Sequence, residues 1–193
     1  AAMSKEIRAG NPAEIRADAE TGSIKVSGYA AVFNQEADIG GAFREQIAPG
    51  AFKNAIGRDD VVFLINHDGL PLARTRSGTL TIREDKHGLF IETELDASDP
   101  DVKSIVPKMK RGDLDKMSFA FKPTVQEWDE SGDIPLRTVQ EATLYDVSIV
   151  TNPAYDGTEI GLRSLEQHRK TQQTGSNNAA RMRMKLTLKG VKA

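Results

Sequence analysis

Hydrophobic residues in this chain either alternate with polar residues or gather in short runs, and both patterns predict β-strands. Residues 23–33 (SIKVSGYAAVF) alternate in part and are rich in strand-forming residues, whereas residues 61–65 (VVFLI) form a compact apolar run. Two longer runs cover residues 117–125 and 136–150, and the polar stretch 127–133 predicts the turn between them. The pattern therefore predicts a protein in which strands predominate.

A β-hairpin is predicted in the middle of the chain. Residues 79–83 and 88–95 have the composition of two strands, and the polar residues 84–87 between them are typical of a turn. The first 22 residues are polar and contain few large hydrophobic side chains, which predicts an irregular or edge segment.

Two short segments carry helix signals. Residues 49–56 (PGAFKNAI) predict a short helix with proline in its first turn, where the missing N–H group is not needed. A longer helix should begin at a cap formed by Ser98 or Asp99 and end at Gly112. Pro107 inside that segment predicts a kink or a break.

Strands outnumber helices and do not form regular βαβ units. We therefore expect an α+β, mainly β fold in which an antiparallel sheet or small β-barrel is flanked by helices. An amphipathic helix is predicted at about residues 155–167 and a linker at 172–180. The expected organisation is a polar N-terminal segment (1–22), a central domain (23–168) and a basic flexible tail (169–193).

Charge is distributed unevenly along the chain. The formal net charge is only −2, yet the tail contains no acidic residue, so the rest of the chain is acidic. Such a tail either contacts an acidic partner, contacts the acidic remainder of the chain, or is a solvated terminus. Its basic residues are Arg169, Lys170, Arg181, Arg183, Lys185, Lys189 and Lys192.

Composition excludes several kinds of chemistry. The chain has no cysteine, which excludes disulfides, a cysteine nucleophile and thiolate metal sites, and agrees with a reducing cytoplasm. No apolar stretch approaches the roughly 20 residues of a membrane helix, and the N-terminal residues do not resemble a signal peptide, so no membrane association is expected.

Three residues are candidates for nucleophilic catalysis. A free serine is a poor nucleophile at pH 7 and needs a base beside it. Ser118 would attack a carbonyl group, His67 would accept its proton, and Asp146 would orient the imidazole and stabilise it once charged. Each residue also has an ordinary explanation: a turn histidine, a serine that bonds the backbone, and an acid that pairs with Arg137.

Other candidate sites are weaker, and no metal or cofactor is expected. Asp96, Asp99 and Asp101 do not match the spacing of a calcium loop. His87 and His168 lie among charged residues far apart in the sequence, which disfavours a zinc site. The chain has no phosphate-binding glycine loop, and only the basic tail favours nucleic acid, so specific nucleic-acid binding is not expected.

Six blocks in a fixed order carry a family resemblance. They are residues 28–33 (GYAAVF), 47–52 (IAPGAF), 66–68 (NHD), 88–89 (GL), 117–121 (MSFAF) and 144–154 (LYDVSIVTNPA). Together they resemble the prohead (capsid maturation) serine proteases of HK97-type tailed phages, a family related to the herpesvirus assemblins. The resemblance extends over about residues 24–160.

This resemblance implies an assemblin-like, helix-flanked β-barrel with His67 as general base and Ser118 as nucleophile. The herpesvirus enzymes have a second histidine as the third catalytic member, whereas the comparable stretch here contains Asp146. Glu141 is the alternative for that role. By the same analogy, backbone groups near residues 151–152 would bind the oxyanion.

The implied function is limited proteolysis inside an immature capsid. The enzyme would cut the scaffolding segment of the major capsid protein and also itself, inside the assembling prohead in the host cytoplasm. The basic tail would serve packaging or self-processing, with cleavage between residues 170 and 181. A homodimer is a candidate assembly by analogy with the assemblins. The alternative is a non-catalytic, scaffold-like β-barrel that binds capsid protein.

Overall fold

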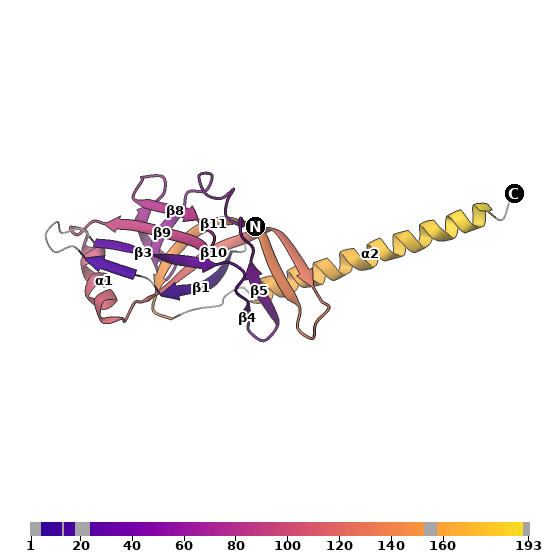
Figure 1. The fold of residues 1–193 in the computed structure, drawn as a ribbon, viewed down its shortest axis with the longest axis horizontal. Coiled ribbons are helices and arrows are strands. Elements are labelled where there is room, and N and C mark those ends of the chain that lie inside the picture. The colour runs from indigo at the N-terminus through magenta and orange to yellow at the C-terminus, as the bar shows by residue number, and fades with distance from the viewer. Residues whose placement is uncertain (1–4, 13, 18–23, 153–157, 191–193) are drawn as a thin grey trace. The chain divides into compact units, whose positions relative to one another are not determined.

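A computed structural model of the chain describes residues 5–12, 14–17, 24–152 and 158–190. The chain divides into two compact units, residues 1–157 and 158–193. The first unit contains all the described strands and one helix (Figure 1). The strands form two sheets, so the expectation of an α+β, mainly β fold is confirmed.

The larger sheet has seven strands and is built around a long antiparallel hairpin. This hairpin consists of β10 and β11, with β1 paired along the outer edge of β10. The strands of this sheet are β1 (Glu6–Pro12), β4 (Ala37–Ile39), β5 (Phe43–Ile47), β6 (Val62–Ile65), β7 (Asp68–Arg74), β10 (Lys116–Asp129) and β11 (Leu136–Val150).

The smaller sheet has four strands, all paired antiparallel. Their order is β2 (Glu14–Ala17), β3 (Ile24–Val32), β9 (Gly88–Leu95) and β8 (Leu80–Glu84). The hairpin predicted from residues 79–95 is thus present as β8 and β9. Gly88 packs directly against β3: a Cβ atom there would lie 2.0 Å from the Ala31 carbonyl oxygen, so only glycine fits.

The predicted antiparallel pairing holds for most strands, but β5 and β6 both run parallel to β11. They lie one after the other along the same edge of this 15-residue strand, β5 beside residues 136–139 and β6 beside 146–149. The segment between them stays hydrogen-bonded to β11: the Ala48 N–H donates to the Val139 carbonyl, and the Leu144 N–H donates to the Asp59 carboxylate. Among the described strands the hydrogen-bonded ladders form two open sheets and do not close into a ring.

The helix α1 (Pro100–Arg111) has the predicted ends. Asp99 is the N-cap, and its side chain accepts a hydrogen bond from the Asp101 backbone N–H. Gly112 ends the helix in the left-handed conformation, with φ of 83°. The helix continues through Pro107 without a break. It lies at one end of the first unit, opposite the tip of the β10–β11 hairpin (Figure 1).

The short helix predicted at residues 49–56 is wrong, because the chain forms a series of turns there. Gly50 and Gly57 adopt left-handed φ values of 88° and 87°, which interrupt a right-handed helix. The buried residues Ala51 and Phe52 anchor the segment, and the Ala51 carbonyl accepts a hydrogen bond from the Ala142 N–H of β11.

The second unit contains one helix, α2 (Thr158–Gly190). The linker predicted at residues 172–180 is therefore wrong, since this segment is helical. The predicted start of the last helix at residue 155 and the boundary at 22–23 lie outside the described residues. Neither described helix has an apolar stretch long enough to cross a membrane.

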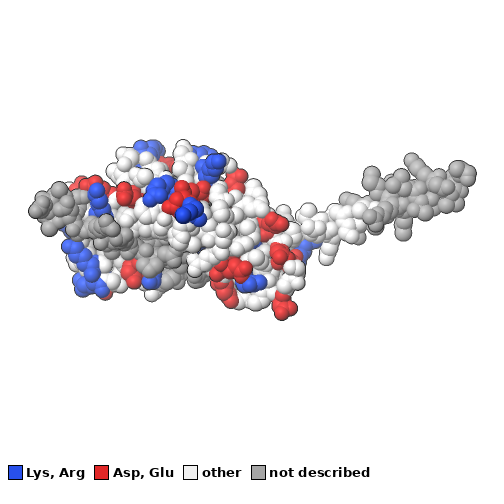
Figure 2. All heavy atoms as spheres, in the orientation of Figure 1, with Lys and Arg blue, Asp and Glu red and all other residues white. Residues whose placement is uncertain are grey.

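The hydrophobic core joins both sheets and α1. Its members include Val26 of β3, Ile91 of β9, Ile105 of α1, Phe119 of β10 and Val147 of β11, all at most 4% exposed. On the face shown in Figure 2, acidic and basic side chains of the first unit lie side by side over the surface. The ion pairs of the first unit include one between Arg74 and Asp60, at 2.5 Å.

Candidate active site

The register of β10 and β11 brings two serines and an aspartate to one face of the larger sheet. Ser118 lies directly opposite Ser148, and Ala120 lies opposite Asp146. Directly opposed residues in a ladder share a face, and so do residues two apart along a strand. Ser118, Ser148 and Asp146 therefore share one face, and all three are at most 3% exposed.

His67 reaches this face from the two-residue turn between β6 and β7. Ile65 pairs with Asp68, and the two residues between them, Asn66 and His67, have φ values of 51° and 60°. Positive φ at both central positions is the signature of a type I′ hairpin turn, in which Gly normally takes the second position. A histidine held in this conformation is strained, and such strain is commonly found at functional sites.

The turn is fixed to the end of β11 by backbone and side-chain hydrogen bonds. The Asn66 N–H donates to the Ile149 carbonyl at 3.0 Å. The Asn66 side-chain oxygen accepts from the Thr151 N–H at 3.0 Å. The His67 N–H donates to the Ser148 hydroxyl at 3.2 Å. These contacts position the imidazole relative to β11.

The structure brings together the three residues that the sequence singles out. His67 Nε2 lies 2.7 Å from Ser118 Oγ, and His67 Nδ1 lies 2.5 Å from Asp146 Oδ1. An ionised carboxylate only accepts hydrogen bonds, so we assign the ring proton to Nδ1. Nε2 then presents its lone pair to the Ser118 hydroxyl, as a general base must.

Asp146 is held in its charged form. Burial works to raise the pKa of Asp146, but the hydrogen bond and charge of His67, the charge of Lys5 and the Ser148 hydroxyl together outweigh it, so the pKa lies below its ordinary value. Lys5 Nζ is 3.3 Å from Asp146 Oδ2. The carboxylate is thus available to orient the imidazole and to balance its charge.

Ser148 is a member of this cluster that the sequence reasoning did not single out. Its hydroxyl donates to Asp146 Oδ1 at 3.1 Å and accepts from the His67 backbone N–H. Its position two residues after Asp146 in a predicted strand was the available signal, because that spacing places both side chains on one face.

The other candidate residues lie elsewhere. Glu141 pairs with Val125, seven positions along β10 from Ser118. The Thr151 N–H, in the segment expected to bind an oxyanion, already donates to Asn66. His87 packs edge-on against Tyr29 with ring centroids 4.4 Å apart, and His168 belongs to α2. The described residues contain no cluster of three or more potential metal ligands.

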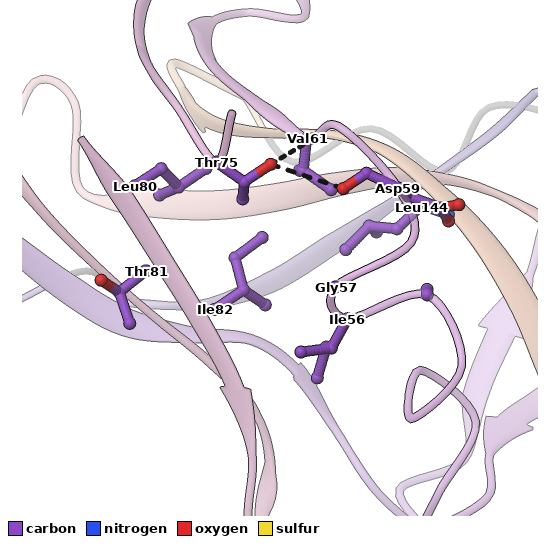
Figure 3. Close-up of a pocket in the computed structure, with 10 residues that line it drawn as sticks. Ile56, Gly57, Asp59, Val61, Thr75, Leu80, Thr81, Ile82 and Leu144 are labelled. Atoms are coloured by element: carbon purple, nitrogen blue, oxygen red, sulfur yellow. Dashed lines mark hydrogen bonds between the residues drawn. The ribbon is translucent and has the colours of Figure 1, made fainter. Parts of the chain in front are cut away.

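A separate hollow of about 250 Å³ lies between β8 and the turn segment before β6 (Figure 3). Its lining includes Ile56, Leu80, Ile82 and Leu144, and one wall carries the Thr75 hydroxyl, which accepts a hydrogen bond from the Val61 N–H at 2.9 Å. None of the three candidate catalytic side chains lines it.

Comparisons with known proteins give the fold relationship and the family of the chain. The structure resembles that of the capsid assembly protease gp21 of bacteriophage T4, with a TM-score of 0.51 and 12% sequence identity. The similarity covers 76% of this chain and 96% of the phage T4 chain, and at this identity it shows a shared fold. None of the curated protein sequences matches the chain.

The family model of caudovirus prohead serine proteases matches residues 11–174, which include His67, Ser118 and Asp146. The resemblance seen in the six sequence blocks is therefore confirmed, and the chain belongs to the caudovirus prohead serine protease family.

Proposed function

We propose that this serine peptidase cuts the scaffolding segment of the major capsid protein during prohead maturation, with Ser118 as nucleophile, His67 as general base and Asp146 as the third member. The observation that best supports these roles is the continuous chain of hydrogen bonds from Ser118 Oγ through His67 to Asp146. By family analogy, the enzyme acts inside the assembling prohead in the host cytoplasm, and a homodimer is its proposed assembly.

In the proposed reaction, Ser118 Oγ forms a bond to the carbonyl carbon of the scissile peptide while its proton passes to His67 Nε2. The carbonyl electrons move to the oxygen and give a tetrahedral intermediate. The C–N bond then breaks, and His67 returns the proton to the leaving amine. A water molecule attacks the acyl-enzyme, again losing its proton to His67, and the acid is released with Ser118 restored. Asp146 stays ionised throughout and balances the imidazolium charge.

The assemblin-like barrel is part of the same proposal. The consecutive strands β1 and β2 belong to different sheets: β1 lies at the edge of the larger sheet and β2 at the edge of the smaller one. β1 also contacts β3, although no backbone ladder joins the two strands. These contacts support a barrel in which one corner is formed by side-chain packing.

The test is cleavage of the major capsid protein encoded with this chain. Ser118→Ala should lower the cleavage rate by at least about a thousandfold, because the nucleophile is removed. Ser77→Ala, in an exposed turn, is the matched control and should cleave normally. Intact mass and gel analysis of the capsid protein measure the rate. Capsid binding by wild-type protein without cleavage would favour the scaffold-like alternative, and equal cleavage by Ser118→Ala would overturn the proposed nucleophile.

Self-processing is tested in the same samples. We propose that cleavage occurs between residues 170 and 181, within the basic tail, and removes its C-terminal part. The wild-type protein should lose a C-terminal fragment that Ser118→Ala retains. Full-length mass in both proteins, while the capsid protein is being cut, would contradict self-cleavage alone.

A further inference from the structure

The proposed nucleophile is completely covered. Ser118 has 0% exposure, although a protease must bring its hydroxyl into contact with a carbonyl carbon of another segment. The cover on one side is β1, which pairs antiparallel with β10 and places Ala9 opposite Ser118. A substrate strand cannot occupy this edge of β10 while β1 is bound there.

β1 also competes for the proton on which the reaction depends. The Ser118 hydroxyl lies 2.8 Å from the Arg8 carbonyl oxygen and 2.7 Å from His67 Nε2. A hydroxyl has one proton to donate. When the proton is directed to the Arg8 carbonyl, it is not directed to the base. The backbone of β1 therefore opposes activation of Ser118 as well as access to it.

Charged side chains hold β1 in this position. Arg8 Nε is 2.6 Å from Glu45 Oε1 of β5, and Glu6 Oε1 is 3.1 Å from Arg137 Nη1 of β11. Arg137 also bonds Glu45, with Nε and Oε2 2.8 Å apart. All four side chains are at most 4% exposed. β1 thus supplies an acidic and a basic side chain, Glu6 and Arg8, which pair with the oppositely charged Arg137 and Glu45.

We propose that the edge of β10 covered by β1 is the substrate-binding edge, and that a substrate strand with an acidic residue, any residue and a basic residue in sequence replaces β1 there. This inference rests on the proposed protease function. Main-chain pairing with β10 would give affinity, as in other cases of strand addition. Arg137 and Glu45 would select the acidic and basic side chains, in the places that Glu6 and Arg8 now occupy. The family match begins at residue 11, so Glu6 and Arg8 lie outside it.

The first test loosens β1 in the full-length protein. Arg8→Ala removes its contacts to Glu45 while leaving the Arg137–Glu45 pair in place. A small fluorophosphonate that labels reactive serines should modify Ser118 at least about threefold faster than in wild type, because part of a buried ion-pair network is lost. Equal or slower labelling would overturn the proposal. Arg111→Ala is the control, because this exposed arginine pairs only locally with Asp113 and should leave the labelling rate unchanged.

The second test locks β1 in place. The chain has no cysteine, so Ile7→Cys with Ala120→Cys provides a unique pair at directly opposed positions. Oxidation should slow Ser118 labelling and capsid cleavage at least about tenfold, and reduction should restore both. Thr81→Cys with Glu92→Cys, a pair of exposed opposed positions in β8 and β9, is the matched control. Unchanged rates on oxidation of the first pair would overturn the proposal.

The third test addresses the charge pattern. A peptide of residues 4–13 added to Arg8→Ala should return labelling to the wild-type rate. The same peptide with Glu6→Arg and Arg8→Glu should not, because it places like charges against Arg137 and Glu45. Equal inhibition by both peptides would overturn the proposed charge pattern.

The three tests together separate this proposal from the proposed function. If all variants cleave and label equally, the strand proposal fails while the proposed protease function is retained. If none cleaves or labels, the proposed function fails and the strand proposal with it.

Discussion

At the residue scale, each ring nitrogen of His67 is committed to a different partner. Nδ1 is held by Asp146, which leaves Nε2 as the acceptor for Ser118. A neutral amide in place of the carboxylate could hold the wrong tautomer and could not balance an imidazolium charge. In the proposed mechanism Asp146 therefore controls both the orientation and the charge of His67.

Replacement of Asp146 discriminates between the two candidates for that third role. Asp146→Asn should lower kcat for capsid cleavage by about 10³–10⁴, the scale expected when a triad carboxylate is lost. Glu141→Gln, which changes the alternative carboxylate, should remain within about twofold. Initial rates measured by gel densitometry give both values, with circular dichroism to verify folding. A larger loss for Glu141→Gln would transfer the role to that residue.

The lowered pKa of Asp146 also predicts how stability depends on pH. A carboxyl whose pKa is depressed on folding stabilises the native state above its ordinary value of 3.8, and that contribution is lost as the pH falls through the native pKa. The difference in free energy of unfolding between wild type and Asp146→Asn should therefore be constant above this range and shrink below pH 3.8. Urea titrations at a series of pH values measure it, and a difference that grows on acidification would contradict the prediction.

At the element scale, the β6–β7 turn determines where the base lies. Several hydrogen bonds of Asn66 and His67 join the turn to the C-terminal end of β11 and to Thr151. Since β6 itself pairs in parallel with β11 from Val62 to Ile65, the turn follows directly from a ladder that also contains Asp146. The strand that carries Asp146 therefore also positions His67.

Asn66→Gly tests this coupling without straining the backbone. Glycine accepts the left-handed φ but lacks the amide that binds Thr151, so kcat should fall about tenfold, the equivalent of about 1.4 kcal/mol of lost positioning. Asn34→Gly is the matched control: Asn34 also has positive φ, 56°, but lies in the turn that follows β3. Its cleavage rate should be unchanged. Similar losses in both variants would indicate a general effect on stability rather than positioning of His67.

Several elements were predictable because their signals are local. The caps of α1 at Asp99 and Gly112 and the β8–β9 hairpin follow from residues adjacent in the sequence. Strands β4, β5 and β7 were not predicted, because they are short or polar and are stabilised by their pairing partners. The turns at residues 49–56 were misread as a helix because proline begins helices and turns alike.

At the scale of the whole molecule, four buried charges join three strands that are far apart in sequence. Glu6 of β1, Glu45 of β5 and Arg137 of β11 meet where Arg137 is 0% exposed, and Arg8 completes the cluster. Burial works to lower the pKa of Arg137, but Glu45 and Glu6 outweigh it and raise the pKa above its ordinary value. Arg137 therefore stays charged and depends on these partners.

Removal of Arg137 should be strongly destabilising. Arg137→Ala leaves two carboxylates buried without their main partner, and the free energy of unfolding should fall by about 3–5 kcal/mol. Arg111→Ala, whose pair with Asp113 is exposed, should change it by less than about 0.5 kcal/mol. Urea denaturation monitored by the single tryptophan measures both. A loss below about 1 kcal/mol for Arg137→Ala would show that the cluster contributes little to stability.

The amino-acid sequence alone was enough to predict the mainly β class, the family, and the three residues proposed for catalysis. These depend on residue types, short-range periodicity and the order of blocks, all of which are written along the chain. Three features became visible only in the folded structure: the parallel placement of β6, the position of Ser148 beside Asp146, and the burial of Ser118 under β1. Each of these depends on which strands pair and in which register. Pairing is decided by contacts between segments far apart in sequence, such as Arg8 and Ser118, which are 110 residues apart, and local patterns do not encode it.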